Sequence, residues 1–124
     1  MHPVLSICIG ACAGAVLRWQ LSVWGNGLSA LPLGTLTANL LGGYLVGLCV
    51  GLFEAMPDLD PQWRLLLVTG FLGALTTFSS FSAEVVAMLV QSRLALAAGT
   101  AALHLMGSLL LTWLGLKTIA WWLS

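Results

Sequence analysis

The sequence predicts an all-α membrane protein in which four transmembrane helices form a single domain over residues 1–124. The first observation is composition, because 60% of the residues are hydrophobic and only 6% are charged. A soluble domain carries roughly 25% charged residues, so this chain cannot cover a surface that faces water. The second observation is length, because four apolar runs each reach the ~20 residues that cross a bilayer core about 30 Å thick.

The four runs are predicted as helices at about residues 4–24, 32–53, 63–90 and 94–123. No Lys or Arg precedes the first run, so we expect a retained helix and not a cleaved signal peptide. The second run begins beside Pro32, which suits the first turn of a helix. The loop that follows it holds three of the four acidic residues and two prolines. The third run carries a cluster of hydroxyl residues near its middle.

This cluster predicts a break in the third helix. Residues 76–82 include five hydroxyl side chains, and they follow Gly70 and Gly73. Glycine and β-branched threonine weaken a helix, and hydroxyl groups can satisfy the carbonyls that a break sets free. A helix broken at mid-membrane presents carbonyl oxygens to a cation and N–H groups to an anion. Phe78 and Phe81 share one face there, either as ring edges along an anion path or as two ordinary core residues.

Polar residues inside the fourth and second helices are further candidates. Four of them recur every fourth residue along the fourth helix and so share one face: Thr100, His104, Ser108 and Thr112. They form either a polar track or a set of side chains that bond carbonyls of their own helix. On the second helix, Asn39 offers two N–H donors, for an anion or for a bond between helices.

Charged side chains near the helix ends bear on orientation and on the pathway. Arg64 and Lys117 lie on one predicted side of the membrane, and Arg18 and Arg93 lie on the other. Since Lys and Arg favour the cytoplasmic side, this even count predicts insertion in both orientations and pairing of two copies as an antiparallel homodimer. Glu84 and Arg18 lie near the same predicted boundary as Arg93, either as an interfacial pair or at a pore mouth.

Three motifs together resemble the signature of the Fluc (CrcB) family of fluoride channels. They are Gly14 with Arg18 and Trp19, residues 34–40, and residues 70–84. The resemblance covers essentially the whole chain. It implies a fluoride-specific channel, and not an enzyme, that exports fluoride passively from the cytoplasm and so gives fluoride resistance. It also implies a dual-topology, antiparallel homodimer in a bacterial inner membrane, with fluoride, the lipid bilayer and a second copy of the chain as partners.

The resemblance implies roles for individual side chains. Phe78 and Phe81 would line the pore, and Asn39 would donate its amide to fluoride. Ser108 and Thr112 would belong to the polar track. Three further residues join the candidate pathway without an assigned role: His104, Glu84 and Arg18.

The resemblance also implies a structural sodium ion (Na+) at the centre of the dimer. The backbone carbonyls of Gly73 and Thr76 from each copy would bind it in a cage of oxygen atoms. Two departures from the family pattern lie beside this site. Ala74 stands where the family usually has a second glycine, and Ser80 stands where it usually has threonine. Both changes are small.

Two other kinds of membrane protein compete with this interpretation. A small multidrug-resistance antiporter is also a short four-helix antiparallel dimer, but it relies on a glutamate in its first helix, and this chain has no glutamate before Glu54. A non-transporting subunit of a larger complex would need no aligned hydroxyl groups.

The net charge of zero predicts no partnership with nucleic acid. Cys8 and Cys12, one helical turn apart, fit small buried hydrophobes better than a metal pair, since no further ligand lies nearby.

Overall fold

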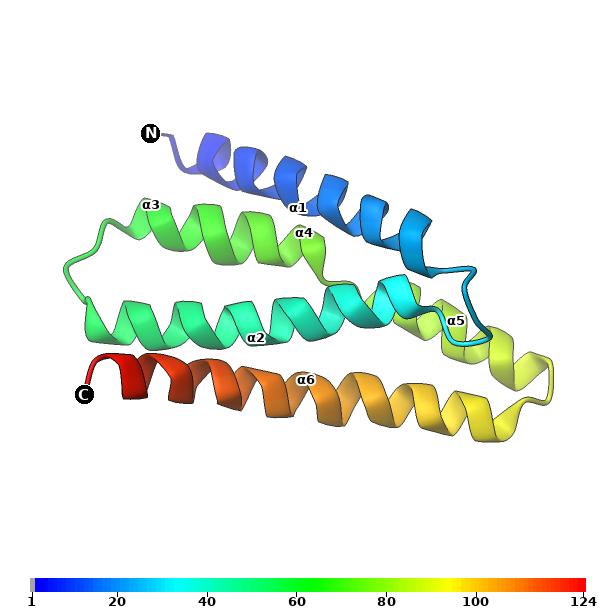
Figure 1. The fold of residues 1–124 in the computed structure, drawn as a ribbon. Helices are drawn as coiled ribbons and strands as arrows, with labels where there is room; N and C mark the ends of the chain where they lie inside the picture. The colour runs from blue at the N-terminus through cyan, green and yellow to red at the C-terminus, as the bar shows by residue number, and fades with distance from the viewer. Residues whose placement is uncertain (1) are drawn as a thin grey trace.

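The computed structural model describes residues 2–124, and its four long apolar segments run side by side (Figure 1). The first, second and last segments are single helices: α1 (Pro3–Gly25), α2 (Leu33–Ala55) and α6 (Leu94–Trp122). The third segment consists of α3 (Pro61–Arg64), the π-helix η1 (Leu65–Leu72), α4 (Gly73–Leu75) and, after a break, α5 (Phe78–Val90). Each of the four segments is long and apolar enough to cross a membrane. The predicted all-α fold with four spans is therefore confirmed.

The helix starts follow local sequence rules. A proline occupies the first turn of α1 and of α3, where the missing N–H has no partner to lose. Asp60 caps α3 because its side chain accepts a hydrogen bond from the Gln62 N–H at 3.0 Å. Between the first two segments, Asn26 Oδ1 accepts a hydrogen bond from the Thr35 N–H at 3.0 Å. α1 begins and α6 ends at the same end of the bundle, as four spans require (Figure 1).

Glycines bring α1 into backbone contact with the first half of the third segment. A Cβ added at Gly10 would overlap the carbonyl oxygen of Leu66, and one added at Gly14 would overlap that of Phe71. Gly70 faces α1 in the same way from the opposite side. In lipid no hydrophobic force drives helices together, so they associate through van der Waals packing. Small residues allow this packing because they let the two backbones approach closely. α1 and η1 are therefore one tightly packed pair.

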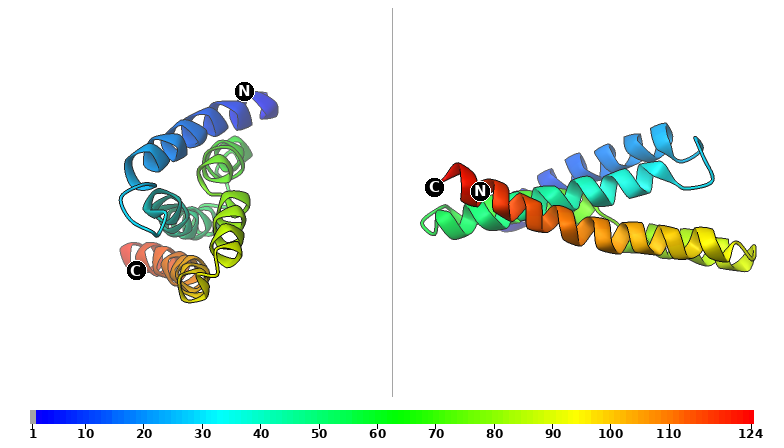
Figure 2. Two further views of the ribbon diagram at one scale, coloured as in Figure 1. Left: turned by 90° about the vertical axis from the view of Figure 1, so that its right-hand side faces the viewer. Right: turned by 60° about the horizontal axis from the view of Figure 1, so that its bottom comes forward.

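A second glycine-lined contact joins α2 to α6. A Cβ at Gly47 would overlap the Thr112 carbonyl oxygen, and a Cβ at Gly115 would overlap the Tyr44 carbonyl oxygen. The Thr112 hydroxyl also donates a hydrogen bond to the carbonyl of Gly43 at 2.9 Å. Figure 2 shows α2 and α6 crossing in close contact along much of their lengths, whereas the α1–α2 loop and the α5–α6 loop lie apart at one end.

Thr76 and Thr77 interrupt the third segment, as the sequence predicted. Both residues have extended backbone, with ψ of 153° at Thr76 and φ of −151° at Thr77. The break lets α5 leave the line of α4 and pack against α6 (Figure 1). The π-helix before the break was not predicted. Such wider turns are rare in proteins and occur frequently at functional sites.

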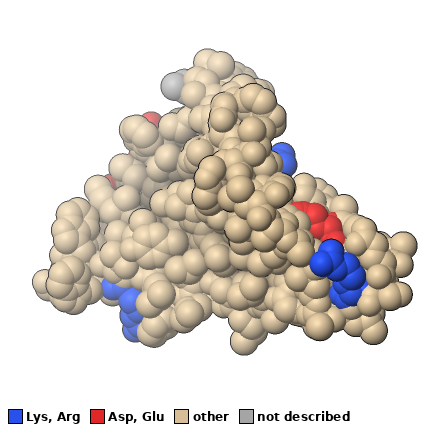
Figure 3. Space-filling model, turned by 45° about the vertical axis from the view of Figure 1, so that its right-hand side comes forward, with Lys and Arg blue, Asp and Glu red and all other residues tan. Residues whose placement is uncertain are grey.

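The chain buries few apolar side chains of its own: Leu36, Ala38, Phe53, Leu72, Leu75, Met88 and Ala97. Many large apolar side chains instead cover the outside. Charged residues are sparse on the face shown in Figure 3. Soluble monomers rarely expose apolar patches of this extent, so lipid or another protein surface must cover this exterior.

Candidate functional site

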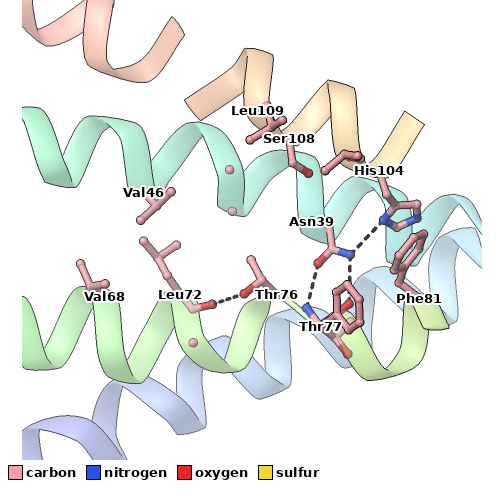
Figure 4. Close-up of a pocket in the computed structure, with 15 residues that line it drawn as sticks. Asn39, Val46, Val68, Leu72, Thr76, Thr77, Phe81, His104, Ser108 and Leu109 are labelled. Atoms are coloured by element: carbon pink, nitrogen blue, oxygen red, sulfur yellow. Dashed lines mark hydrogen bonds between the residues drawn. The ribbon is translucent and has the colours of Figure 1, made fainter. Parts of the chain in front are cut away.

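An open groove of about 500 Å³ lies between α2, the third segment and α6. Much of its wall is apolar, and its polar groups gather around the break (Figure 4). Seven of the ten site residues predicted from the sequence line it: Asn39, Gly73, Thr76, Phe78, Phe81, His104 and Ser108. The fold thus collects in one place side chains and carbonyls that lie far apart in the sequence.

Asn39 joins α2 to the break in the third segment. Its Oδ1 accepts a hydrogen bond from the Thr77 N–H at 2.8 Å, and its Nδ2 donates to the Thr77 carbonyl at 3.1 Å. The Thr77 N–H has no helical partner at the break, so Asn39 Oδ1 supplies one, while Nδ2 binds the carbonyl of the same residue directly before α5. Nδ2 also lies 3.0 Å from Nδ1 of His104 on α6. One amide therefore links three segments (Figure 4).

The break also frees the two carbonyl groups that were predicted to bind a cation. In a continuous helix the Gly73 carbonyl would receive the N–H of Thr77, but that N–H donates to Asn39. The Thr76 carbonyl would receive the N–H of Ser80, which instead donates to the Thr77 hydroxyl at 3.1 Å. Within residues 2–124, neither carbonyl oxygen accepts a backbone hydrogen bond across the break. Unpaired carbonyl oxygens at a helix break are suitable cation ligands.

Phe78 and Phe81 form a short aromatic wall beside Asn39. The two rings meet edge to face, with centroids 5.6 Å apart and planes at 66°. Phe81 is half-buried and stacks on the His104 ring at a centroid distance of 4.4 Å. Phe78 is 78% exposed and projects from the chain. The predicted shared face is confirmed, and Phe78 is too exposed to be an ordinary core residue of a single copy.

The polar stripe of α6 divides between helix packing and the groove. Thr100 and Thr112 hold neighbouring helices, by hydrogen bonds to a methionine sulfur of α5 at 3.5 Å and to a carbonyl of α2 at 2.9 Å. His104 and Ser108 line the groove. Across residues 2–124, none of the four bonds a carbonyl of α6 itself. The interpretation in which these side chains merely satisfy their own helix therefore fails.

Arg18 and Glu84 lie outside the lining of the groove. Arg18 Nε donates a hydrogen bond to the Ala74 carbonyl at 3.0 Å, so this side chain reaches the break and not the membrane boundary near Arg93. Both carboxylate oxygens of Glu84 are shielded from solvent and make no hydrogen bond within the described chain. The interfacial pair that the sequence allowed is therefore not formed. A place for Glu84 at a pore mouth stays a prediction.

Thr77 is a groove residue that the sequence reasoning did not single out. Its backbone is bound by Asn39, and its hydroxyl caps α5 by accepting the Ser80 N–H. A threonine directly before the first residue of a helix is a recognised start signal. That signal is present in the sequence, but it can be recognised only when the position of the break is known.

Residues 5–116 match the family described as CrcB-like protein, Camphor Resistance (CrcB). A protein of Albidiferax ferrireducens is 67% identical over 118 residues, which cover 95% of this chain and 91% of the relative. A protein of Paracidovorax citrulli is 57% identical over 118 residues, covering 95% of this chain and 94% of the relative. A protein of Variovorax paradoxus is 60% identical over 117 residues, with 94% of each chain covered. All three relatives bear the name fluoride-specific ion channel FluC. With four membrane-spanning segments and a family match over most of its length, the chain belongs to the CrcB family of multi-pass membrane proteins.

Proposed function

We propose that this chain is a fluoride-specific ion channel that exports fluoride passively across the bacterial inner membrane. The observation that carries the proposal is the groove, where an amide, hydroxyl groups and phenylalanine rings meet. The names of the relatives, all bacterial proteins, point to the same function. A channel catalyses no reaction, so the chain is a transporter and not an enzyme.

The mechanism rests on replacing the water around a small, strongly hydrated anion. The Asn39 amide and the Ser108 hydroxyl supply hydrogen-bond donors along the groove, whereas the Thr112 hydroxyl donates to the Gly43 carbonyl and would have to exchange that bond to join the track. Phe78 and Phe81 offer the positive edges of their rings, which attract an anion without the trapping effect of a full charge. Several weak sites in series let an ion both enter and leave.

The membrane potential supplies the driving force. Hydrogen fluoride crosses a membrane as a neutral acid and ionises inside, so fluoride accumulates as an anion. A potential that is negative inside pushes an anion outward with about 2.3 kcal/mol per charge per 100 mV. A passive pathway is therefore enough for fluoride resistance.

A second copy of the chain closes the groove in our proposal. The groove is open on one side, and the exposed Phe78 projects from it. We place an antiparallel partner there, so that ring edges from one copy meet polar side chains of the other. The even count of Lys and Arg on the two predicted sides supports this arrangement, because it favours insertion in both orientations.

A structural sodium ion fits the same arrangement. The carbonyls of Gly73 and Thr76 lack the helical partners that they would have in a continuous helix. With two such oxygens from each copy, the dimer would offer a set of oxygen ligands on its symmetry axis. When bound, the ion would supply positive charge that holds the two breaks together.

Fluoride efflux from liposomes that contain only this protein tests the proposal. We expect efflux down a fluoride gradient, measured with a fluoride electrode. Replacement of Phe78 or Phe81 by isoleucine should abolish efflux, because isoleucine keeps the bulk but has no positive ring edge. Phe71→Ile is the matched control, since Phe71 lies in the same segment but outside the groove, and it should retain efflux.

The result also separates the competing functions. Full transport in both groove variants would contradict the assigned role of the rings. No efflux from the purified wild-type protein would favour a non-transporting subunit. Fluoride movement that depends on a counter-transported cation would favour an antiporter.

A further inference from the structure

We propose that His104 accepts a hydrogen bond from one N–H of Asn39 while the groove is empty, and that fluoride takes over this N–H when it binds. This inference rests on the proposed fluoride pathway and adds a residue that positions its amide donor. It follows from the way the hydrogen-bonding capacity of a single side chain is shared among its neighbours.

The backbone of Thr77 fixes which way the Asn39 amide points. The Thr77 N–H can only donate, so the atom 2.8 Å from it is the amide oxygen. The Thr77 carbonyl can only accept, so the atom 3.1 Å from it is the amide nitrogen. A flipped amide would lose both hydrogen bonds. The NH₂ group of Asn39 therefore faces α6 in a single orientation.

The same orientation determines the state of His104. The amide nitrogen has no lone pair to offer, so the 3.0 Å contact requires His104 Nδ1 to accept. His104 is then neutral, with its proton on Nε2. The residue is only 5% exposed, and its ring packs against Phe81 while Nδ1 lies 3.0 Å from the amide nitrogen.

Both N–H groups of Asn39 are therefore occupied before any anion binds. An anion in the groove can take an Asn39 donor only by displacing one acceptor. The two bonds to Thr77 hold the break and reinforce each other. The bond to His104 is single and ends on a side chain, whereas both bonds to Thr77 end on backbone, so the bond to His104 is the one that yields.

Such an exchange suits an ion channel. A buried donor without any partner is costly, so an empty pathway needs a resident acceptor for the Asn39 N–H. The same acceptor competes with fluoride for this N–H. The competition keeps the binding of fluoride weak and so favours its release from the site. His104 is thus a positioning residue that acts on fluoride through Asn39.

Two substitutions separate the acceptor from the ring. His104→Phe keeps an aromatic ring beside Phe81 but removes the acceptor, whereas His104→Asn returns an oxygen close to the position of Nδ1. In liposomes, we measure the initial rate of fluoride efflux against fluoride concentration. His104→Phe should lower the half-saturating concentration about fivefold, the factor equivalent to one net hydrogen bond of about 1 kcal/mol. His104→Asn should bring it back toward the wild-type value.

A purely structural role predicts a different result. Both variants would then lose maximal rate with no change in half-saturating concentration, and this outcome would overturn the inference. An equal shift in both variants would overturn it as well. If wild-type protein moves no fluoride, the proposed function itself fails, and the two failures are thereby distinguished.

A measurement on the unaltered protein keeps the inference testable if a variant does not fold. The ¹⁵N resonance of His104 Nδ1 reports whether this atom accepts a hydrogen bond. In detergent micelles, saturating sodium fluoride should shift this resonance and that of the Asn39 amide, whereas sodium chloride at equal concentration should not. An Nδ1 resonance that fluoride leaves unchanged would overturn the proposal.

Discussion

Single side chains at the break show how this protein replaces lost helical hydrogen bonds. The Thr77 hydroxyl accepts the Ser80 N–H at 3.1 Å and so starts α5. Thr77→Val removes this cap and should lower the free energy of unfolding by about 1 kcal/mol. Thr77→Ser keeps the oxygen and should retain most of the stability. Unfolding in mixed micelles, followed by tryptophan fluorescence, measures both; equal stability of the two variants would contradict the capping role.

The sequence indicated which of these residues matter, but it did not indicate which residues they bind. Asn39 was visible because a polar side chain at mid-membrane depth is costly and needs an explanation. The roles of Phe78 and Phe81 came from the family motif, since two phenylalanines on one face are equally typical of a core. The bond between Asn39 and Thr77 was not visible, since no local pattern relates residues 38 positions apart. The same holds for Arg18, which was placed at the membrane boundary but reaches the Ala74 carbonyl.

At the scale of the helices, glycines determine which segments pack together. Gly10 faces the Leu66 carbonyl without room for a Cβ, whereas a Cβ at Gly99 would meet nothing within 4 Å. Gly10→Ala should therefore separate α1 from η1 and cost about 1–3 kcal/mol. Gly99→Ala should be neutral or stabilising by up to about 1 kcal/mol, because alanine favours a helix. Thermal unfolding followed by size-exclusion chromatography compares them, and similar losses in both would contradict tight α1–η1 packing.

The sequence predicted the existence of these helices more reliably than their internal form. Long apolar runs place all four spans, because the bilayer sets their length. The break was visible in the hydroxyl cluster. The π-helix of residues 65–72 was not, since a run of apolar residues carries no signal that distinguishes its wider turn from an α-helical one.

At the scale of the whole molecule, orientation in the membrane is the open prediction. A reporter fused to the C-terminus should be detected on both sides of the membrane if copies insert both ways. Arg93→Ala should shift the C-terminus toward the cytoplasm, because Arg64 and Lys117 would then outweigh the other side. The double variant Arg64→Ala with Lys117→Ala should shift it outward. A reporter confined to one side in the unaltered protein would contradict dual topology.

Because the chain buries few apolar side chains, its helices can separate from one another without unfolding. This limits which measurements can report its stability. Each membrane helix satisfies most of its backbone groups within itself, so separating the helices in a micelle need not melt them. Far-ultraviolet circular dichroism will then change little while the tertiary structure is lost. Energy transfer between labels on α1 and α6 will report the transition instead, since it responds to the distance between helices and not to their coiling.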